Sequence, residues 1–163
     1  MILLGLGSNL GDREAWLRRA LAELESRDVK VVRESSLYET APVGYLGQPD
    51  FLNQVCEVQW RQSPLHLLEA CAGVENELGR QRQVDQGPRN IDIDILYYHD
   101  RIVRTRQIQV PHPRIAERAF VLVPLEELAP DFVDPLSGLS IREMRRVCPD
   151  RSRVERWSVG GGN

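Results

Sequence analysis

Hydrophobic and polar positions along the first third of the chain predict a strand, a helix and a second strand. The apolar residues 2–6 indicate a strand, and a glycine- and serine-rich turn follows at residues 7–11. Asp12 is then a suitable N-cap for a helix. The apolar side chains of this helix recur at helical spacing, at Leu17, Ala20, Leu21 and Leu24. Residues 29–32 and 37–38 are interpreted as parts of a second strand.

The middle of the chain has the clearest periodicity. From Phe51 to Trp60, side chains of two different kinds alternate, which is typical of a strand with two distinct faces. Ser63 and Pro64 form the N-cap and first turn of a further helix. Its apolar side chains are Leu67, Cys71, Val74 and Leu78. Residues 90–98 then predict another strand.

The last third is less regular. We expect a short strand at residues 102–103, a mainly helical segment at 114–128 that Pro124 breaks or bends, a short helix at 140–147 and a last strand at 154–157. The order β-α-β-β-α-β with extra elements predicts an α+β fold of ferredoxin-like character, with helices packed on a mostly antiparallel sheet in three α/β/α layers. One domain is expected over residues 1–158, followed by a frayed glycine-rich tail at 159–163.

Composition and charge narrow the class of protein. With 163 residues, 42% hydrophobic and 28% charged, the chain has the composition of a globular protein. No apolar run reaches the roughly 20 residues that span a bilayer, and the start has no basic leader, so we expect no membrane contact. We also expect a cytoplasmic protein and a monomer. The three cysteines form no CxxC pair, which favours reduced thiols. A net charge of −3 argues against a nucleic-acid partner.

Two connections are longer than packing requires. Residues 39–50 and 79–90 each span about a dozen positions, near the length above which a loop without secondary structure is usually functional or disordered. We interpret both as candidate mobile walls of a site.

The strand at residues 90–98 carries the most informative pattern. Its isoleucines point to one face, and Asp92 and Asp94 point to the other, with Cα atoms about 6.5 Å apart. Two carboxylates so placed repel one another unless a cation lies between them. Mg²⁺ prefers carboxylate oxygens and completes its shell with water and phosphates, so the pair could anchor two Mg²⁺ ions on a polyphosphate. The alternative is a solvated face of an edge strand, and the alternation alone does not decide between them.

Arginines near this pair favour an anionic partner. Arg89 lies three residues before Asp92, and Arg80 and Arg82 lie on the preceding loop. Guanidinium groups can bind phosphate oxygens through two hydrogen bonds at once. The alternative is that these arginines are solvated loop residues without a ligand. No GxxxxGK[ST] motif is present, so a nucleotide would be held by arginines and metal.

Aromatic and amide side chains could bind a flat heterocycle. Phe51 and Asn53 share one strand face and could stack on a ring and hydrogen-bond its edge, and Phe120 is a second aromatic candidate. Taken singly, each of these three residues is more typical of a buried core than of a ligand-binding site. The glycines of Gly5-x-Gly7 are interpreted as part of a structural strand-to-helix turn.

His112 is the one histidine with a restricted backbone. It lies between Pro111 and Pro113, which favours an extended conformation and fixes the direction of its imidazole. Arg118 is expected about a turn and a half into the following helix. A lone histidine is usually structural, and His66 and His99 are interpreted in that way.

Several motifs follow one another along almost the whole chain. They are Gly7-Ser8-Asn9-Leu10, Tyr38-Glu39-Thr40, Gln48-Pro49-Asp50-Phe51-Leu52-Asn53, Glu75 with Leu78-Gly79-Arg80-x-Arg82, Gly87-Pro88-Arg89-x-x-Asp92-x-Asp94-Ile95-Leu96, Val110-Pro111-His112, and Arg118-x-Phe120-Val121-Leu122-x-Pro124-Leu125. In this order they resemble the 6-hydroxymethyl-7,8-dihydropterin pyrophosphokinases of folate biosynthesis. The element that begins at Gly87 is the most specific.

This resemblance implies a reaction and a set of site residues. The terminal pyrophosphoryl unit of ATP would pass to the hydroxymethyl oxygen of the reduced pterin, leaving AMP. Asp92 and Asp94 would hold two Mg²⁺ ions that bridge the ATP phosphates, and together with Arg80 and Arg89 they would be catalytic. The phosphates or the nucleotide would be contacted by Arg80, Arg82, Arg89, His112 and Arg118, with Glu75 nearby. The pterin pocket would be lined by Thr40, Val43, Phe51, Asn53 and Phe120.

The chain departs from the family pattern at three places. Asp85-Gln86 stands where many members have Arg-Trp, Phe51 stands where tyrosine is common, and Pro113 stands where an aromatic residue is common. We expect the reaction to survive these changes. We find no general base, and we expect one Mg²⁺ to acidify the pterin hydroxyl while the two long loops close.

Two other functions are considered. A metal-dependent nucleotidyl or glycosyl transferase would also use an Asp-x-Asp strand, but it leaves Phe51, Asn53, His112 and Arg118 unexplained. A non-enzymatic RNA-binding module on a ferredoxin-like sheet is opposed by the acidic charge and by the aspartates on the expected ligand side.

Overall fold

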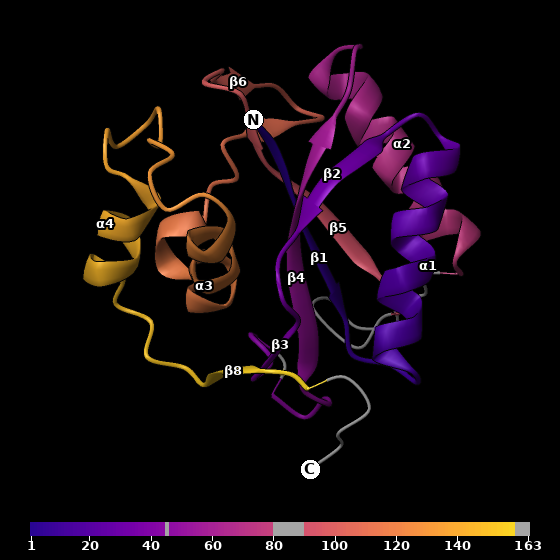
Figure 1. The fold of residues 1–163 in the computed structure, drawn as a ribbon, viewed down its shortest axis with the longest axis horizontal. Helices are drawn as coiled ribbons and strands as arrows, with labels where there is room; N and C mark the ends of the chain where they lie inside the picture. Colours follow the sequence, from indigo (N-terminus) through magenta and orange to yellow (C-terminus); the bar gives the residue numbers. More distant parts are fainter. Residues whose placement is uncertain (45, 80–89, 159–163) are drawn as a thin grey trace.

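The fold is built on one antiparallel sheet between two layers of helices (Figure 1). The structure is a computed structural model that describes residues 1–44, 46–79 and 90–158. Its elements are β1 (Ile2–Ser8), α1 (Arg13–Ser26), β2 (Lys30–Glu34), β3 (Tyr38–Thr40), β4 (Phe51–Gln59), α2 (Pro64–Glu77), β5 (Asp92–Tyr98), β6 (Val103–Arg104), β7 (Gln109–Val110), a 3-10 helix (Ile115–Glu117), α3 (Ala119–Leu128), α4 (Ile141–Val147) and β8 (Val154–Arg156).

The six-stranded sheet has the order β5-β1-β4-β3-β8, and β2 also pairs with β4. Each of these described pairings is antiparallel. β1 and β4 therefore form the centre, and β5 lies on the edge beside β1. The α+β, ferredoxin-like prediction is confirmed by this arrangement.

Each face of the sheet has its own hydrophobic core. Alternate residues of β1 such as Leu4 and Leu6 pack with Leu17 of α1 and Leu67 of α2. On the other face Leu3 packs with the apolar residues of α3 and α4, which include Leu122, Leu125, Ile141 and Met144. Figure 1 shows α1 and α2 on one side of the sheet and α3 and α4 on the other, as the three-layer prediction requires.

Three of the predicted helix starts are confirmed by their caps. The Asp12 carboxylate accepts a hydrogen bond from the Ala15 N–H at 3.1 Å, and the Ser63 hydroxyl accepts one from the His66 N–H at 3.2 Å. Ser140 forms a reciprocal capping box with Glu143 at the start of α4. These contacts satisfy N–H groups that have no partner within the helix.

The prediction that residues 29–32 and 37–38 are parts of one strand is wrong. Two strands, β2 and β3, pair with β4 one after the other. Between them the Ser35 hydroxyl accepts a hydrogen bond from the Val55 N–H at 2.9 Å, and the Ser35 N–H donates to the Val55 carbonyl at 2.8 Å. Because a side-chain oxygen replaces a backbone carbonyl at this point, the regular ladder is interrupted.

The helical segment after the His112 motif is also shorter than predicted. Residues Ile115–Glu117 form a 3-10 helix, and Arg118 is extended with φ −128° and ψ 102°. The α-helix begins only at Ala119 and continues through Pro124, so of the expected break or bend the proline does not cause a break. The proline removes one donor from the helix, which the packing of its buried neighbours tolerates.

The remaining expectations have mixed outcomes. The short strand expected at 102–103 lies at Val103–Arg104 and pairs with Gln109–Val110, a strand that was not predicted. The cysteines are free and buried. Within the described residues, no helix is both long and apolar enough to cross a membrane. The predicted tail at residues 159–163 lies outside the described residues.

Candidate active site

A pocket of about 410 Å³ lies where β1, β4 and β5 meet the start of α3. All of the predicted site residues that the structure describes line it. They are Thr40, Val43, Phe51, Asn53, Glu75, Asp92, Asp94, His112, Arg118 and Phe120. The predicted Arg80, Arg82 and Arg89, and the Asp85-Gln86 departure, lie outside the described residues.

Two glycines form the floor of the pocket. Gly7 lies in β1, between Asp92 of β5 and Asn53 of β4, and Gly5 lies between Asp94 and Val55. Directly paired residues of neighbouring strands project from the same face of a sheet. The two glycines therefore leave a gap in the row of side chains between the aspartates and the β4 residues.

These glycines correct the interpretation of Gly5-x-Gly7 as a strand-to-helix turn, because both lie inside a paired strand. A Cβ atom on Gly7 would lie 2.7 Å from the Asn53 Oδ1 atom, closer than real contacts allow, whereas one on Gly5 would lie 3.4 Å from the Leu96 side chain. The sequence did hold a signal: glycines two residues apart in a strand belong to one face.

Asp92 and Asp94 project from the edge strand into this pocket. Both are half-buried, whereas Ile93 and Ile95 are buried in the opposite core, as the alternation predicts. The Ile93 N–H donates a hydrogen bond to the Glu75 carboxylate at 2.8 Å. Glu75, which is 8% exposed and belongs to α2, thus fixes the backbone between the two aspartates.

Asp92 and Asp94 fit a metal ion whose other ligands come from water and substrate. Among the described residues, no three or more side chains of His, Cys, Asp or Glu come together as a ready-made metal site. Two carboxylates are the usual protein share of a Mg²⁺ site that is completed by water and substrate phosphates. The residues present therefore suit Mg²⁺ bound together with a polyphosphate, rather than a structural metal.

His112 is held beside the aspartates with a neutral ring. The backbone N–H of His112 donates to the Leu96 carbonyl at 3.0 Å, and the backbone N–H of Arg114 donates to the His112 Nδ1 atom at 3.3 Å. Burial, followed by the nearby Arg118 charge, lowers the pKa of His112 to about 4, although Asp92 opposes the shift. Since Nδ1 accepts a hydrogen bond, the ring proton lies on Nε2, which is a donor.

Arg118 supplies positive charge at the same end of the pocket. Burial lowers the pKa of its guanidinium, and Asp94 and Asp92 oppose this shift. Arg118 lies at the extended N-cap of α3, which corrects the expectation that it lies within the helix. Its guanidinium carbon lies 5.5 Å from the centre of the Phe120 ring.

The other end of the pocket carries the aromatic and amide groups. The Asn53 amide donates to the Thr40 hydroxyl at 2.5 Å, and both residues are buried. Thr40 pairs with Phe51 across β3 and β4, so the three side chains lie together. Val43 is 41% exposed at the edge. This part of the pocket can hold a flat ring by apolar contact and meet its polar edge with an amide.

Comparisons of the sequence with known proteins agree on one family. The sequence model described as 7,8-dihydro-6-hydroxymethylpterin-pyrophosphokinase (HPPK) matches residues 3–130. A Bacillus subtilis 2-amino-4-hydroxy-6-hydroxymethyldihydropteridine pyrophosphokinase is 50% identical over 156 residues, which cover 94% of this chain and 93% of that protein. A Methylorubrum extorquens protein of the same name is 44% identical and covers 94% and 96% of the two chains.

Longer proteins contain a similar region. The folic acid synthesis protein fol1 of Pneumocystis carinii is 42% identical over 86% of this chain, which spans only 19% of that protein. Among solved structures, wild-type HPPK-DHPS of Plasmodium falciparum matches 89% of this chain and 44% of that chain, with a TM-score of 0.69. At 15% identity this match shows a shared fold.

Proposed function

This chain belongs to the 7,8-dihydro-6-hydroxymethylpterin-pyrophosphokinase family, and we propose that the pocket on β1, β4 and β5 is its active site. The reaction is the transfer of a pyrophosphoryl group from ATP to the hydroxymethyl group of 6-hydroxymethyl-7,8-dihydropterin, in folate synthesis. What remains to assign is the part that each side chain takes.

One observation carries the assignment. The glycine floor at Gly5 and Gly7 separates a charged end, with Asp92 and Asp94, from an end with the ring-binding Phe51 and the Asn53 amide. A reaction between a nucleotide polyphosphate and a flat heterocycle needs two such regions within reach of one another. The two substrates can thus meet above Gly5 and Gly7, because these residues have no side chains to fill that space.

At the charged end, Asp92 and Asp94 would bind two Mg²⁺ ions together with the ATP phosphates. When bound, Mg²⁺ supplies neutralisation of the phosphate charge and lowers the pKa of a coordinated hydroxyl. Glu75 holds the backbone between the two aspartates, so that both carboxylates keep their direction. This arrangement suits phosphoryl chemistry, in which positioning and charge neutralisation carry most of the catalysis.

His112 and Arg118 would stabilise the charge that moves during transfer. The neutral imidazole can donate from Nε2 to a phosphate oxygen, and the Arg118 guanidinium can contact the same group. We assign Arg80, Arg82 and Arg89 the same type of role, from the resemblance of their motifs to those of the family. No described side chain of the pocket stands out as a general base, which is consistent with activation of the hydroxyl by metal.

The pterin would be bound by Thr40, Val43, Phe51 and Asn53 at the other end of the pocket, and by Phe120, which lies beside Arg118. Phe51 and Phe120 offer aromatic surfaces, and Asn53 offers an amide oxygen and nitrogen for the heteroatoms of the ring. We also propose that the protein acts as a monomer.

Product analysis tests this function. The protein is incubated with ATP, Mg²⁺ and 6-hydroxymethyl-7,8-dihydropterin, and the nucleotide products are separated. We expect AMP in equal amount to the pterin diphosphate, and none without the pterin. Formation of ADP, or ATP turnover that does not depend on the pterin, would point instead to another metal-dependent transferase.

A further inference from the structure

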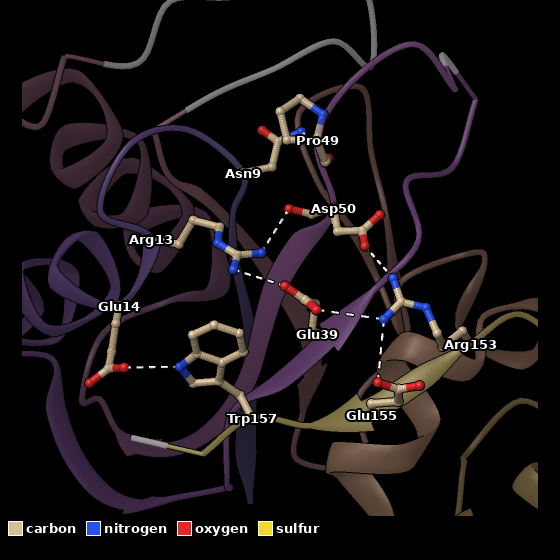
Figure 2. A network of polar contacts seen from close by, with 9 residues as sticks. All are labelled: Asn9, Arg13, Glu14, Glu39, Pro49, Asp50, Arg153, Glu155 and Trp157. Carbon is tan, nitrogen blue, oxygen red and sulfur yellow. Dashed lines mark hydrogen bonds and ion pairs between the residues drawn. The ribbon is translucent and has the colours of Figure 1, made fainter. Parts of the chain in front are cut away.

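Two arginines from opposite ends of the chain meet at the base of the segment that joins β3 to β4. Arg13 is the first residue of α1, and Arg153 directly precedes β8. Figure 2 shows the two guanidinium groups approaching Glu39 from opposite sides, with Asp50 beside them. Glu39 is the middle residue of β3, and Asp50 directly precedes β4, so the two residues lie on either side of this segment's base.

Each arginine contacts both Glu39 and Asp50. The Arg13 Nη2 atom lies 2.8 Å from Glu39 Oε2, and its Nη1 atom donates to the Asp50 carbonyl at 3.1 Å. Arg153 pairs with the Asp50 carboxylate, and its Nη1 atom lies 3.5 Å from Glu39 Oε1. The two oxygens of Glu39 are therefore shared between the two arginines, which link four residues in one network.

The linked residues are direct neighbours of the proposed pterin site. Glu39 precedes Thr40 and Asp50 precedes Phe51, and Thr40 and Phe51 pair across β3 and β4. A change in the separation of Glu39 and Asp50 must move the backbone of the two site residues, because one peptide bond joins each pair. Neither arginine lines the pocket itself.

The arginines are held in turn by the C-terminal strand. The Arg13 guanidinium carbon lies 5.0 Å from the centre of the Trp157 ring, and the Trp157 indole N–H donates to Glu14 at 3.0 Å. β8 pairs with β3 so that Val154 lies opposite Thr40. This outer strand thus brings Arg153 to the base of the segment.

We propose that Arg13 and Arg153 are positioning residues for the pterin end of the active site: by holding Glu39 and Asp50 together, they set the places of Thr40 and Phe51. This role rests on the proposed assignment of Thr40 and Phe51 to the pterin. Arg153 is exposed, and ion pairs of exposed side chains contribute little to stability. We therefore expect the loss of Arg153 to change the geometry of the pterin end and to affect one substrate selectively.

Arg153→Gln tests the proposal, and Glu155→Gln accompanies it because Arg153 also forms an ion pair with Glu155 at 3.4 Å. Glu155→Gln should leave the KM for the pterin unchanged. For Arg153→Gln we expect the KM for the pterin to rise roughly threefold to tenfold, with the KM for ATP and the melting temperature nearly unchanged. Arg153→Lys keeps a positive charge that can reach one of the two carboxylates. Its KM for the pterin should lie between the values of the wild-type protein and of Arg153→Gln.

Asp50→Asn weakens the ion pair with Arg153 from the other side but leaves the contact of Arg153 with Glu39, so its rise in pterin KM should be smaller and the double variant should match Arg153→Gln. Asp50→Asn serves as the test if Arg153→Gln does not fold.

Arg142→Gln is the matched control, because it breaks the ion pair of Arg142 with Asp131 at 2.8 Å, on α4 and away from the pocket. It should leave both KM values unchanged. An unchanged pterin KM in Arg153→Gln, an equal rise for both substrates, or multiplying effects in the double variant would each overturn the proposal. If the wild-type protein forms no AMP that depends on the pterin, the proposed function itself fails, which is a distinct result.

Discussion

Glu75 accepts a hydrogen bond from the backbone N–H of Ile93, the residue between Asp92 and Asp94. A carboxylate on a helix thereby fixes the edge of the sheet at the point where the proposed metal ligands project. On an edge strand an outward-facing N–H has no partner strand, and here it is buried, so it needs such an acceptor.

Two variants of Glu75 separate its hydrogen bond from its charge. Glu75→Ala removes the acceptor and should destabilise the protein by about 1–3 kcal/mol and lower kcat. Glu75→Gln keeps an oxygen for the Ile93 N–H and should retain more of both. Urea unfolding and steady-state kinetics give the two quantities. Equal losses in kcat for the two variants would show that the negative charge matters, and not the hydrogen bond to Ile93.

Replacing either aspartate should abolish binding of ATP that depends on magnesium. Asp92→Asn and Asp94→Asn each remove a negative ligand, so we expect kcat to fall by about 100-fold or more. Titration calorimetry with ATP, with and without Mg²⁺, measures the linkage, and chelation with EDTA should stop turnover of the wild-type protein until Mg²⁺ is restored.

Asp100→Asn is the control for these two variants, since Asp100 is exposed in the turn after β5. It should bind ATP and turn over as the wild-type protein does. Unchanged turnover in a variant that lacks both Asp92 and Asp94 would refute the metal assignment.

A methyl group on the pocket floor should displace Asn53. Gly7→Ala would place its Cβ atom 2.7 Å from Asn53 Oδ1, so the amide must move and its hydrogen bond to Thr40 weakens. We expect pterin affinity to fall about tenfold, whereas ATP affinity changes less. Equilibrium binding of each substrate measures this.

Gly5→Ala is the comparison for Gly7→Ala, because its Cβ atom would make an ordinary contact of 3.4 Å with Leu96. Its effect on pterin affinity should be clearly smaller. If the two variants lose equal affinity, the clash with Asn53 is not the cause.

The contact between Tyr38 and Glu127 should make stability depend on pH in the acidic range. Burial opposes the charge of Glu127, but hydrogen bonds from the Tyr38 hydroxyl at 2.6 Å and from Ser36 lower the pKa of Glu127 below its usual value. A lowered pKa in the folded state contributes stability above the unfolded pKa of about 4.3, and this contribution is lost as the pH falls through the folded value.

The difference in free energy of unfolding between the wild-type protein and Glu127→Gln should therefore shrink as the pH falls from about 7 to about 3. Denaturant unfolding at several pH values measures it. Tyr38→Phe should reduce the same difference at neutral pH, because one of the hydrogen bonds to the carboxylate is gone. A difference that stays constant over this range would contradict the assignment.

Local patterns in the sequence predict most elements correctly because their causes are local. Caps at Asp12, Ser63 and Ser140, and the alternation around Asp92 and Asp94, act within a few residues. The break between β2 and β3 is different, since it depends on the Ser35 hydroxyl meeting Val55 of a strand twenty residues away. Likewise, the start of α3 at Ala119 involves a hydrogen bond from its N–H to Asp150.

The sequence by itself determines the chemistry that is available: two acidic side chains on one strand face, a histidine between prolines, and an amide next to an aromatic ring. Only the tertiary structure decides that these groups share a pocket, because the order β5-β1-β4 places Gly5 and Gly7 between them. The physical reason is one of range. Side-chain direction along a strand repeats every two residues and can be read from neighbours, whereas the strand that lies alongside depends on how the whole chain buries its two cores.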